Sequence, residues 1–434
     1  MSGNMTIDGV VVEARIDIAD KKRSVQIVDQ TLLTIASTRQ SEQELWRFVE
    51  MLRRTGADIL EIDDYAMKRL CKRFEFEGSE EEAGTEDSMS QLLLSLSFAY
   101  RVSNPFPDFF ASVPYEIRKT IKFLIFPIDI IARLFENKRG NNGSHLFDSW
   151  SGWCSRQGMR IIVEVPLESF SQWKFPLDRQ ADRQLDFQKD GILDAAHYSY
   201  EQICDYVTRA KAEVLRIKGL ERNALPFDFN QIQKLQRELG VEVEICAGNA
   251  GYMATALAVE AIKSGAGYVT TSFAGGKGSK AAAFEEVVMA KTLLLNLGTN
   301  GENFSLLQRM TEVYQRLTGT ATNPMKPITG SDIFHYESGI HAAGMMKNHA
   351  IYEPYPPEMV GKRRELLLGK HTGSYALHMK LRQWDIDVSP EMFERLLESL
   401  RSLSVEWKRG LLDREVLALV RGTIYGANRR HDIT

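Results

Sequence analysis

Short apolar runs rich in β-branched residues alternate along the chain with longer stretches in which apolar positions recur every three or four residues. The short runs are typical of buried parallel strands, and the longer stretches are typical of amphipathic helices. We expect eight strands, over residues 25–33, 59–62, 92–99, 121–126, 160–165, 213–217, 241–246 and 268–273. Each is followed by a helical pattern, the first beginning at Ser41 and the others covering residues 65–74, 115–120, 149–157, 198–210, 229–239, 254–264 and 281–296.

Eight consecutive strand–helix units predict an α/β fold closed into a (β/α)8 TIM barrel, because a doubly wound sheet normally ends after five or six strands. We expect a polar extension over residues 1–24 and the barrel over residues 25–299. Residues 300–434 are predicted to form a mainly helical lid and C-terminal region. That region holds a Gly- and His-rich segment, 328–373, and then two further helices.

The amino-acid composition excludes several classes of protein. The 434 residues are 44% hydrophobic and 26% charged with a net charge of −4, so no basic face for nucleic acid is expected. The most apolar run, 120–135, contains Lys122, Asp129 and Arg133, which argues against a membrane span. Four widely spaced cysteines and the absence of a signal-like apolar core near Met1 favour a cytoplasmic protein. The acidic segment 75–87 is interpreted as a solvated loop.

Residues at the ends of two predicted strands are candidates for ligand binding or catalysis. The loop 275–280 reads GGKGSK, and its glycines, together with Lys277 and Lys280, could hold a phosphate or carboxylate ahead of the following helix. A solvated loop is the alternative. Cys246, at the end of the seventh strand, is either a small core residue or a thiol that reacts or binds a soft metal.

Three linked motifs follow the barrel. Residues 334–373 read FHYESGIHAAGMMKNHAIYEPYPPEMVGKRRELLLGKHTG. This closely resembles the post-barrel lid of homocitrate synthases, especially the nitrogen-fixation type, and of 2-isopropylmalate synthases. Weaker matches at DQTL (29–32) and LEI (60–62) extend the resemblance over nearly the whole chain.

The resemblance implies a Claisen condensation of acetyl-CoA, or another acyl-CoA, with a 2-oxo acid. Such a reaction needs a base beside the thioester and an electrophile at the ketone. In this family a glutamate after strand five and the histidine of G-I-H provide the base, assisted by a tyrosine. These positions are Glu168, His341 and Tyr352.

The same resemblance implies substrate contacts in the lid, at Ser338, Lys370 and His371. Lys277 and Lys280 are candidate substrate contacts because of the loop pattern, since the family's own motif after strand eight is absent here. It also implies a homodimer, because the lid histidine of the family serves the barrel of the partner subunit. The first lid histidine of the family is replaced by Tyr336, with His335 beside it.

The metal half of the family's site departs from the pattern. Where the family has D-T-T-L-R-D-G-E-Q, the chain has Leu33 for the arginine and Thr34 for the metal-binding acid. Where strand seven of the family ends H-x-H, the chain has Cys246 and Gly248, and no histidine lies between 197 and 335. We therefore expect no metal at the usual position.

The sequence leaves three hypotheses about function open. The first is an acyl-CoA-dependent condensing enzyme that relies on Glu168, His341 and Tyr352. The second is a non-catalytic paralogue that binds a carboxylate, a CoA compound or an active relative, and the third is a metal-free lyase or aldolase that forms a Schiff base on Lys218 or Lys277.

Overall fold

The computed structural model describes the barrel strands and most of the helices around them. The described residues are 25–38, 41–75, 91–103, 113–136, 143–167, 198–219, 230–278, 280–298, 301–336, 348 and 352–431. The predicted extension 1–24 and most of the acidic segment 75–87 lie outside them.

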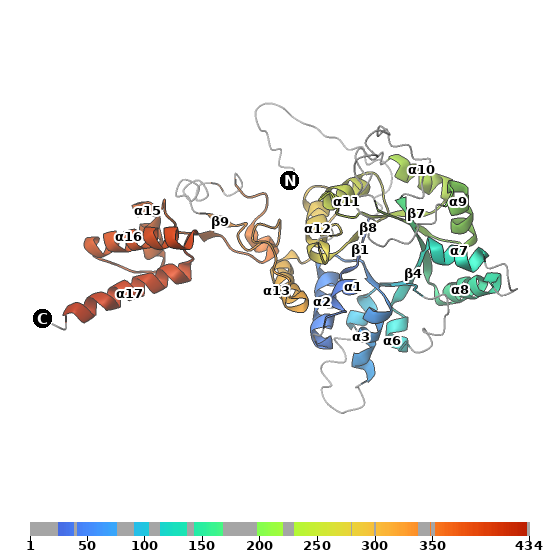
Figure 1. The fold of residues 1–434 in the computed structure, drawn as a ribbon, viewed down its shortest axis with the longest axis horizontal. Helices are drawn as coiled ribbons and strands as arrows, with labels where there is room; N and C mark the ends of the chain where they lie inside the picture. The colour runs from blue at the N-terminus through green and yellow to red at the C-terminus, as the bar shows by residue number, and fades with distance from the viewer. Residues whose placement is uncertain are drawn as a thin grey trace.

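Eight parallel strands close into a barrel in sequence order, as predicted (Figure 1). The seam is formed by the first and last strands, where Asp29 pairs with Thr271. The strands are β1 (Gln26–Asp29), β2 (Ile59–Ile62), β3 (Phe98–Arg101), β4 (Ile121–Pro127), β5 (Arg160–Pro166), β6 (Val214–Lys218), β7 (Glu242–Cys246) and β8 (Tyr268–Thr271).

The helices between the strands form a shell around the barrel. They are α1 (Thr31–Ile35), α2 (Glu42–Thr55), α3 (Asp64–Glu75), α6 (Tyr115–Arg118), α7 (Ile128–Glu136), α8 (Gly143–Gln157), α9 (Tyr200–Arg209), α10 (Asn230–Leu239), α11 (Ala254–Lys263) and α12 (Phe284–Leu293), with the 3-10 turn η3 (Phe273–Gly275) after β8.

Local sequence determines where several of these helices begin. The Ser41 side chain caps α2 by accepting a hydrogen bond from the Glu44 backbone N–H. Ser199 and Gln202 form a complete capping box at the start of α9. Each helix then buries its apolar stripe against the outside of the barrel.

Three predicted elements are wrong in detail. The first strand is shorter than 25–33, because the Asp29 carboxylate accepts a hydrogen bond from Thr31 N and the chain turns into α1. Residues 91–95 are helical, so β3 begins only at Phe98. After Gly373 there are three helices, not two.

The barrel interior is filled in layers. Alternate residues of each strand point inward, and eight apolar ones form a separate buried cluster: Val28, Ile59, Ala99, Phe123, Ile125, Ile162, Val214 and Tyr268. Near the amino ends of the strands, Arg160 lies over the rings of Phe123 and Tyr268, 5.2 and 5.9 Å from their centroids. On the carboxyl side of the apolar cluster the inward positions are charged.

Residues beyond the barrel form two regions. The turn η4 (Phe304–Leu306) and helix α13 (Leu307–Thr318) pack on α1 and α2, and their apolar side chains join the core around the barrel. The short strands β9 (His335–Tyr336) and β10 (Glu365–Leu366) pair with each other, with the turn η6 (Pro357–Val360) between them.

The last three helices, α15 (Ser374–Gln383), α16 (Pro390–Trp407) and α17 (Asp413–His431), lie to one side of the barrel (Figure 1). They have a hydrophobic core of their own, which includes Leu377, Leu400 and Val420. The C-terminal helices therefore do not depend on the barrel for burial of their apolar faces.

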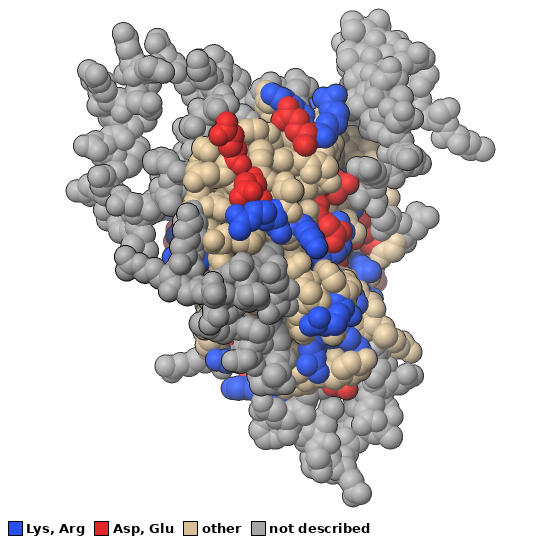
Figure 2. All heavy atoms as spheres, turned by 90° about the vertical axis from the view of Figure 1, so that its right-hand side faces the viewer, with Lys and Arg blue, Asp and Glu red and all other residues tan. Residues whose placement is uncertain are grey.

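The barrel face in Figure 2 carries interspersed basic and acidic side chains among its described residues, in keeping with the net charge of −4. Within the described chain, none of the helices combines the length and apolar character that crossing a bilayer requires.

Candidate active site

Five charged side chains from five strands meet at the carboxyl side of the barrel interior. We call Glu61, Arg101, Glu164, Arg216 and Glu244 the barrel charge network. Barrel enzymes place their chemistry at this end of the strands. The network therefore occupies the region where a substrate or metal would be expected.

Arginines hold the network together. Arg101 forms a two-bond pair with Glu164, with nitrogen–oxygen distances of 2.9 and 2.6 Å, and donates its Nε to Glu61 at 2.8 Å. Arg216 is fully buried and donates an Nη1 hydrogen bond to Glu61 at 2.7 Å. Its Nη2 lies 2.9 Å from a Glu244 oxygen.

The arginines keep two of the glutamates ionised. Burial alone would raise the pKa of Glu164, but the hydrogen bonds and charge of Arg101, with Arg216, outweigh burial and hold that pKa well below its usual range. The pKa of Glu61 is likewise lowered, because Arg216 and Arg101 overcome the effect of burial. A carboxylate held in this way is a weak base, so neither residue suits proton abstraction.

Three buried atoms of the network lack a hydrogen-bond partner among the described residues: Arg216 Nε, Arg216 Nη2, which has only its ion-pair contact with Glu244, and Glu244 Oε2. The other oxygen of Glu244 accepts a hydrogen bond from Thr270 at 2.6 Å. Lys218, at the end of β6, places its ammonium 3.7 Å from a Glu164 oxygen while about half of its side chain stays exposed. Lys218 is therefore more accessible to a ligand than Arg101, which is 22% exposed, or the fully buried Arg216.

The positions expected to bind metal do not supply donors. Cys246 is buried, and burial raises the pKa of its thiol to about 11, so it is protonated near neutral pH. Gly248 has no side chain and bridges to Ala281, while Asn249 Oδ1 accepts a hydrogen bond from Ala254 N at the start of α11. In the described part of the chain, no three His, Cys, Asp or Glu side chains form a group that could hold a metal ion.

Asp29, the first residue of the DQTL match, turns away from the barrel interior. Its carboxyl accepts hydrogen bonds from Thr31 N and the Thr271 hydroxyl, and it is fully buried. Burial is the main cause that raises its pKa to about 7, with a smaller contribution from the charge of Glu285. This carboxyl belongs to the packing between β1, β8 and α12.

Three of the predicted lid and loop residues, Glu168, Ser338 and His341, lie outside the described residues. Tyr352 is described, and it is 44% exposed. The residue after it, Glu353, accepts hydrogen bonds from Tyr336 and from Arg364. Tyr336, at the position of the family's first lid histidine, thus has a role in fixing the lid.

His335, the neighbour of Tyr336, lies between two carboxylates. Its two ring nitrogens lie 3.5 Å from Asp332 and 3.6 Å from Glu365. Lys370 and His371 are exposed in the turn before α15, and the neighbouring Thr372 is fixed by Arg401 of α16. These two residues therefore belong to the part of the chain that packs with the C-terminal helices.

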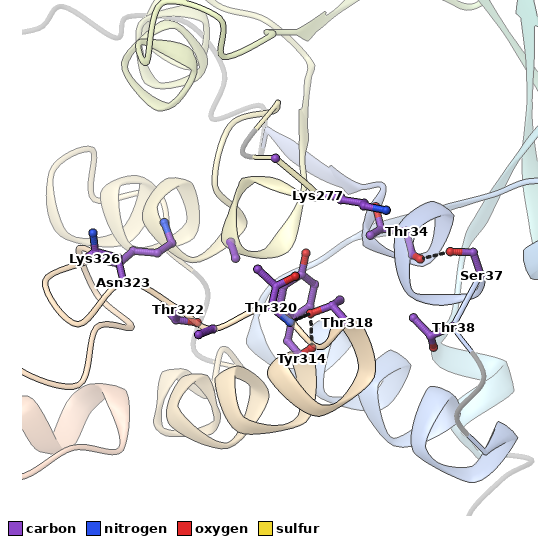
Figure 3. Close-up of a pocket in the computed structure, with 14 residues that line it drawn as sticks. Thr34, Ser37, Thr38, Lys277, Tyr314, Thr318, Thr320, Thr322, Asn323 and Lys326 are labelled. Carbon is purple, nitrogen blue, oxygen red and sulfur yellow. Dashed lines mark hydrogen bonds between the residues drawn. The ribbon is translucent and has the colours of Figure 1, made fainter.

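The glycine-rich loop after β8 borders a cavity of about 320 Å³ (Figure 3). Gly276, Lys277 and Gly278 line the cavity together with α1 and the end of α13. Lys280 lies beside the loop, with its Cε 3.7 Å from where a side chain at Gly278 would begin. The structure thus brings Lys277 and Lys280 to one loop, away from Lys370 and His371.

Sequence reasoning missed the barrel charge network. A signal was present: β2, β5, β6 and β7 each carry one charged residue flanked by apolar ones at an inward position. Such a residue on a buried strand needs a charged partner inside the barrel. Which partner it finds depends on the register of all eight strands.

The chain is similar in sequence to proteins of known families. Residues 328–408 match the family model described as homocitrate synthase post-HMGL domain-like. The chain is 27% identical over 401 residues to the homocitrate synthase omega subunit of Clostridium pasteurianum, an alignment that covers 91% of this chain and 95% of that one.

A second relative is 2-isopropylmalate synthase 2 of Caldanaerobacter subterraneus subsp. tengcongensis, 30% identical over 275 residues, which are 61% of this chain and 71% of the relative. Among solved structures, hydroxymethylglutaryl-CoA lyase from Pseudomonas aeruginosa aligns over 69% of this chain and 94% of its own, with 13% identity and a TM-score of 0.44.

Proposed function

Because the chain belongs to the homocitrate synthase and 2-isopropylmalate synthase family, we propose that it condenses an acyl-CoA with a 2-oxo acid without the family's metal centre. The observation that carries this proposal is the family match over 328–408, the segment that contains His341 and Tyr352. In the proposed reaction Glu168 and His341 remove a proton next to the thioester. The resulting carbanion attacks the ketone carbon of the oxo acid, a carbon–carbon bond forms, and the ketone oxygen becomes an alkoxide that takes up a proton. Water then hydrolyses the thioester of the condensed product, which releases free CoA and leaves a carboxylate.

The proposed reaction also needs a group that stabilises the negative charge on the ketone oxygen. In the family a divalent metal polarises this oxygen. Here the residues at the metal-ligand positions do not fit an ion: Thr34 and Gly248 offer no charged donor, and Cys246 is a buried, protonated thiol. We assign the stabilising positive charge to Lys218, which stands at the end of β6 with its ammonium near Glu164.

The experiment is a thiol-release assay on the full chain. Acetyl-CoA is mixed with a panel of 2-oxo acids, with a chelator and separately with Mg²⁺, Mn²⁺ or Zn²⁺, and free CoA is followed. We expect release that depends on the oxo acid, resists the chelator, and falls by about a hundredfold or more in His341→Ala. Release that requires an added metal would contradict the metal-free half of the proposal.

A second candidate is a non-catalytic paralogue. The simultaneous replacement of the family's arginine, metal-binding acid and both strand-seven histidines favours it, as does the pairing of the interior carboxylates with Arg101 and Arg216. Binding of CoA by calorimetry, with no thiol release across the panel, would support this candidate. A Schiff base on Lys218 or Lys277 would instead be trapped by borohydride in the presence of a carbonyl substrate.

We also propose a homodimer in which His341 reaches the barrel of the partner subunit. Light scattering during size-exclusion chromatography measures the mass in solution. We expect twice the 49.3 kDa of one chain. A monomer at micromolar concentration would contradict the proposal that His341 of one subunit reaches the barrel of the other.

A further inference from the structure

The cavity beside the β8 loop has a lining suited to an oxyanion. We define the loop cavity as the 320 Å³ space between the loop 276–278, α1 and the segment 314–326 (Figure 3). Its lining residues are rich in hydroxyl, amide and ammonium groups, and no Asp or Glu is among them. A polar cavity without carboxylates favours anions over cations.

Several hydrogen-bond donors of the loop cavity are unused. The hydroxyls of Thr34, Thr320 and Thr322 and the amide nitrogen of Asn323 have no partner among the described residues. By contrast, Ser37 and Thr318 donate to backbone carbonyls at 2.7 and 2.8 Å. Some of the lining hydroxyls are therefore structural, and the remaining ones are available to a ligand.

A buried tyrosine adds a further donor. Tyr314 lines the loop cavity and is 4% exposed, yet its hydroxyl has no hydrogen-bond partner in the described part of the chain. Burial, with the nearby charges of Glu285 and Asp29, raises the pKa of Tyr314 to about 12, so the hydroxyl keeps its proton and can donate. The Tyr314 hydroxyl can therefore donate to a ligand that occupies the cavity.

Lys277 supplies the charge. Its side chain is exposed, extends towards Thr34 in Figure 3, and forms no ion pair with any described residue. Lys326 also lines the cavity, but Glu285 and Glu286 hold its ammonium at 3.0 and 2.7 Å. Lys277 is therefore the lining cation whose charge is left for a ligand.

The loop backbone is shaped to approach a ligand closely. Gly275, Gly276 and Gly278 have φ values of 79°, 75° and 75°, in the left-handed region, and the N–H groups of Lys277 and Gly278 have no acceptor among the described residues. Unpaired backbone N–H groups in a glycine-rich loop can donate to an anion. A side chain at 276 would be strained and would place Cβ 3.0 Å from Ser272 Oγ.

We propose that the loop cavity binds the phosphate group of a small ligand, with Lys277 as the principal charge and Thr34, Thr320 and Tyr314 as hydrogen-bond donors. The ligand is either free phosphate or the phosphate of a larger molecule such as CoA. This inference goes beyond the proposed condensation because it requires binding only, so it can hold or fail independently of catalysis.

The test is calorimetric titration of the full chain with inorganic phosphate. We expect binding that Lys277→Met weakens by about tenfold or more, while Lys277→Arg retains it. Thr320→Val, which removes an exposed hydroxyl, should weaken binding to a smaller extent. Lys234→Met, an exposed lysine on α10, is the matched control and should leave the dissociation constant unchanged.

Competition identifies the source of the phosphate. CoA that displaces phosphate in a Lys277-dependent manner, where pantetheine does not, would support the site and assign it to the phosphates of CoA. Phosphate binding that CoA leaves unaffected would support the site as one for a smaller phosphorylated ligand. No binding of inorganic phosphate, or an unchanged dissociation constant in Lys277→Met, would overturn the proposal.

Discussion

At the scale of single residues, burial decides what the charged side chains inside the barrel can do. Arg216 is fully buried and contacts Glu61, Glu164 and Glu244. Removing one partner of a buried ion pair leaves the other charges without compensation. Arg216 therefore stabilises the fold by compensating the charges of the three glutamates that point into the barrel.

Arg216→Met should lower the free energy of unfolding by about 3–5 kcal/mol, because it leaves buried carboxylates unpaired. Urea denaturation followed by circular dichroism measures the change. Lys263→Met on α11, whose ion pair with Glu260 is exposed, is the control and should change stability by less than about 0.5 kcal/mol. Equal effects of the two substitutions would show that the network contributes little.

The raised pKa of Asp29 predicts a pH dependence of stability. Its pKa is raised from 3.8 to about 7, mainly by burial, so folding favours the protonated carboxyl. The contribution to stability is fully present below about pH 4 and is lost as the pH rises through about 7, at up to about 1.4 kcal/mol per pH unit. Stability should thus fall between pH 5 and pH 8.

Asp29→Asn keeps an acceptor for Thr31 N but cannot titrate. Denaturation at pH 5 and pH 8 should show a smaller loss of stability in this variant than in the native chain. If the two proteins lose stability in parallel, the titrating group lies elsewhere.

The residue scale also marks the limit of what the sequence predicts. Lys277 could be predicted as a ligand contact, because glycines and lysines in a loop before a helix form a local pattern. The donors Tyr314, on α13, and Thr320, just beyond the end of α13, could not, because they follow the barrel in sequence and meet the loop only after folding. The contacts of Arg216 depend on strand register in the same way.

At the scale of helices and strands, the spacing of apolar residues and the helix-capping residues predicted most of the barrel. The strands β4 to β7 agree with the sequence within about a residue or two, since each is a short run in which most residues are apolar. The errors occur where a side chain redirects the backbone. Asp29 ends β1 early, and a helical turn at 91–95 replaces the start of the predicted third strand.

Ser199→Ala should destabilise the protein by about 1 kcal/mol, because it removes the side-chain half of the capping box of α9. Ser402→Ala, at an exposed position inside α16, should instead be neutral or stabilising by a few tenths of a kcal/mol, because alanine favours helix interiors. Thermal denaturation of both variants measures the difference. The same sign of change in both would contradict the capping argument.

At the scale of the whole molecule, the described residues form three hydrophobic cores. One fills the barrel interior, one surrounds the barrel and includes α13, and the third lies among α15, α16 and α17. Residues that contact only members of their own core should report on that core alone.

Leu400→Ala should therefore loosen the C-terminal helices, at a cost of about 2–5 kcal/mol for that core, and leave the barrel protected. Leu52→Ala on α2, equally buried, is the matched substitution for the barrel. Hydrogen exchange read by mass spectrometry separates the two. Loss of protection throughout the chain in Leu400→Ala would mean that the two cores unfold as one.

The seam between β1 and β8 has a consequence for how the chain is made. It joins Asp29 to Thr271, 242 positions apart, so the ring of strands closes only after the last strand has left the ribosome. Until then the interior that holds the inward glutamates and arginines is open to water through the gap between β1 and β8. The nascent barrel thus keeps its charges hydrated through most of synthesis and dehydrates them in a single late step.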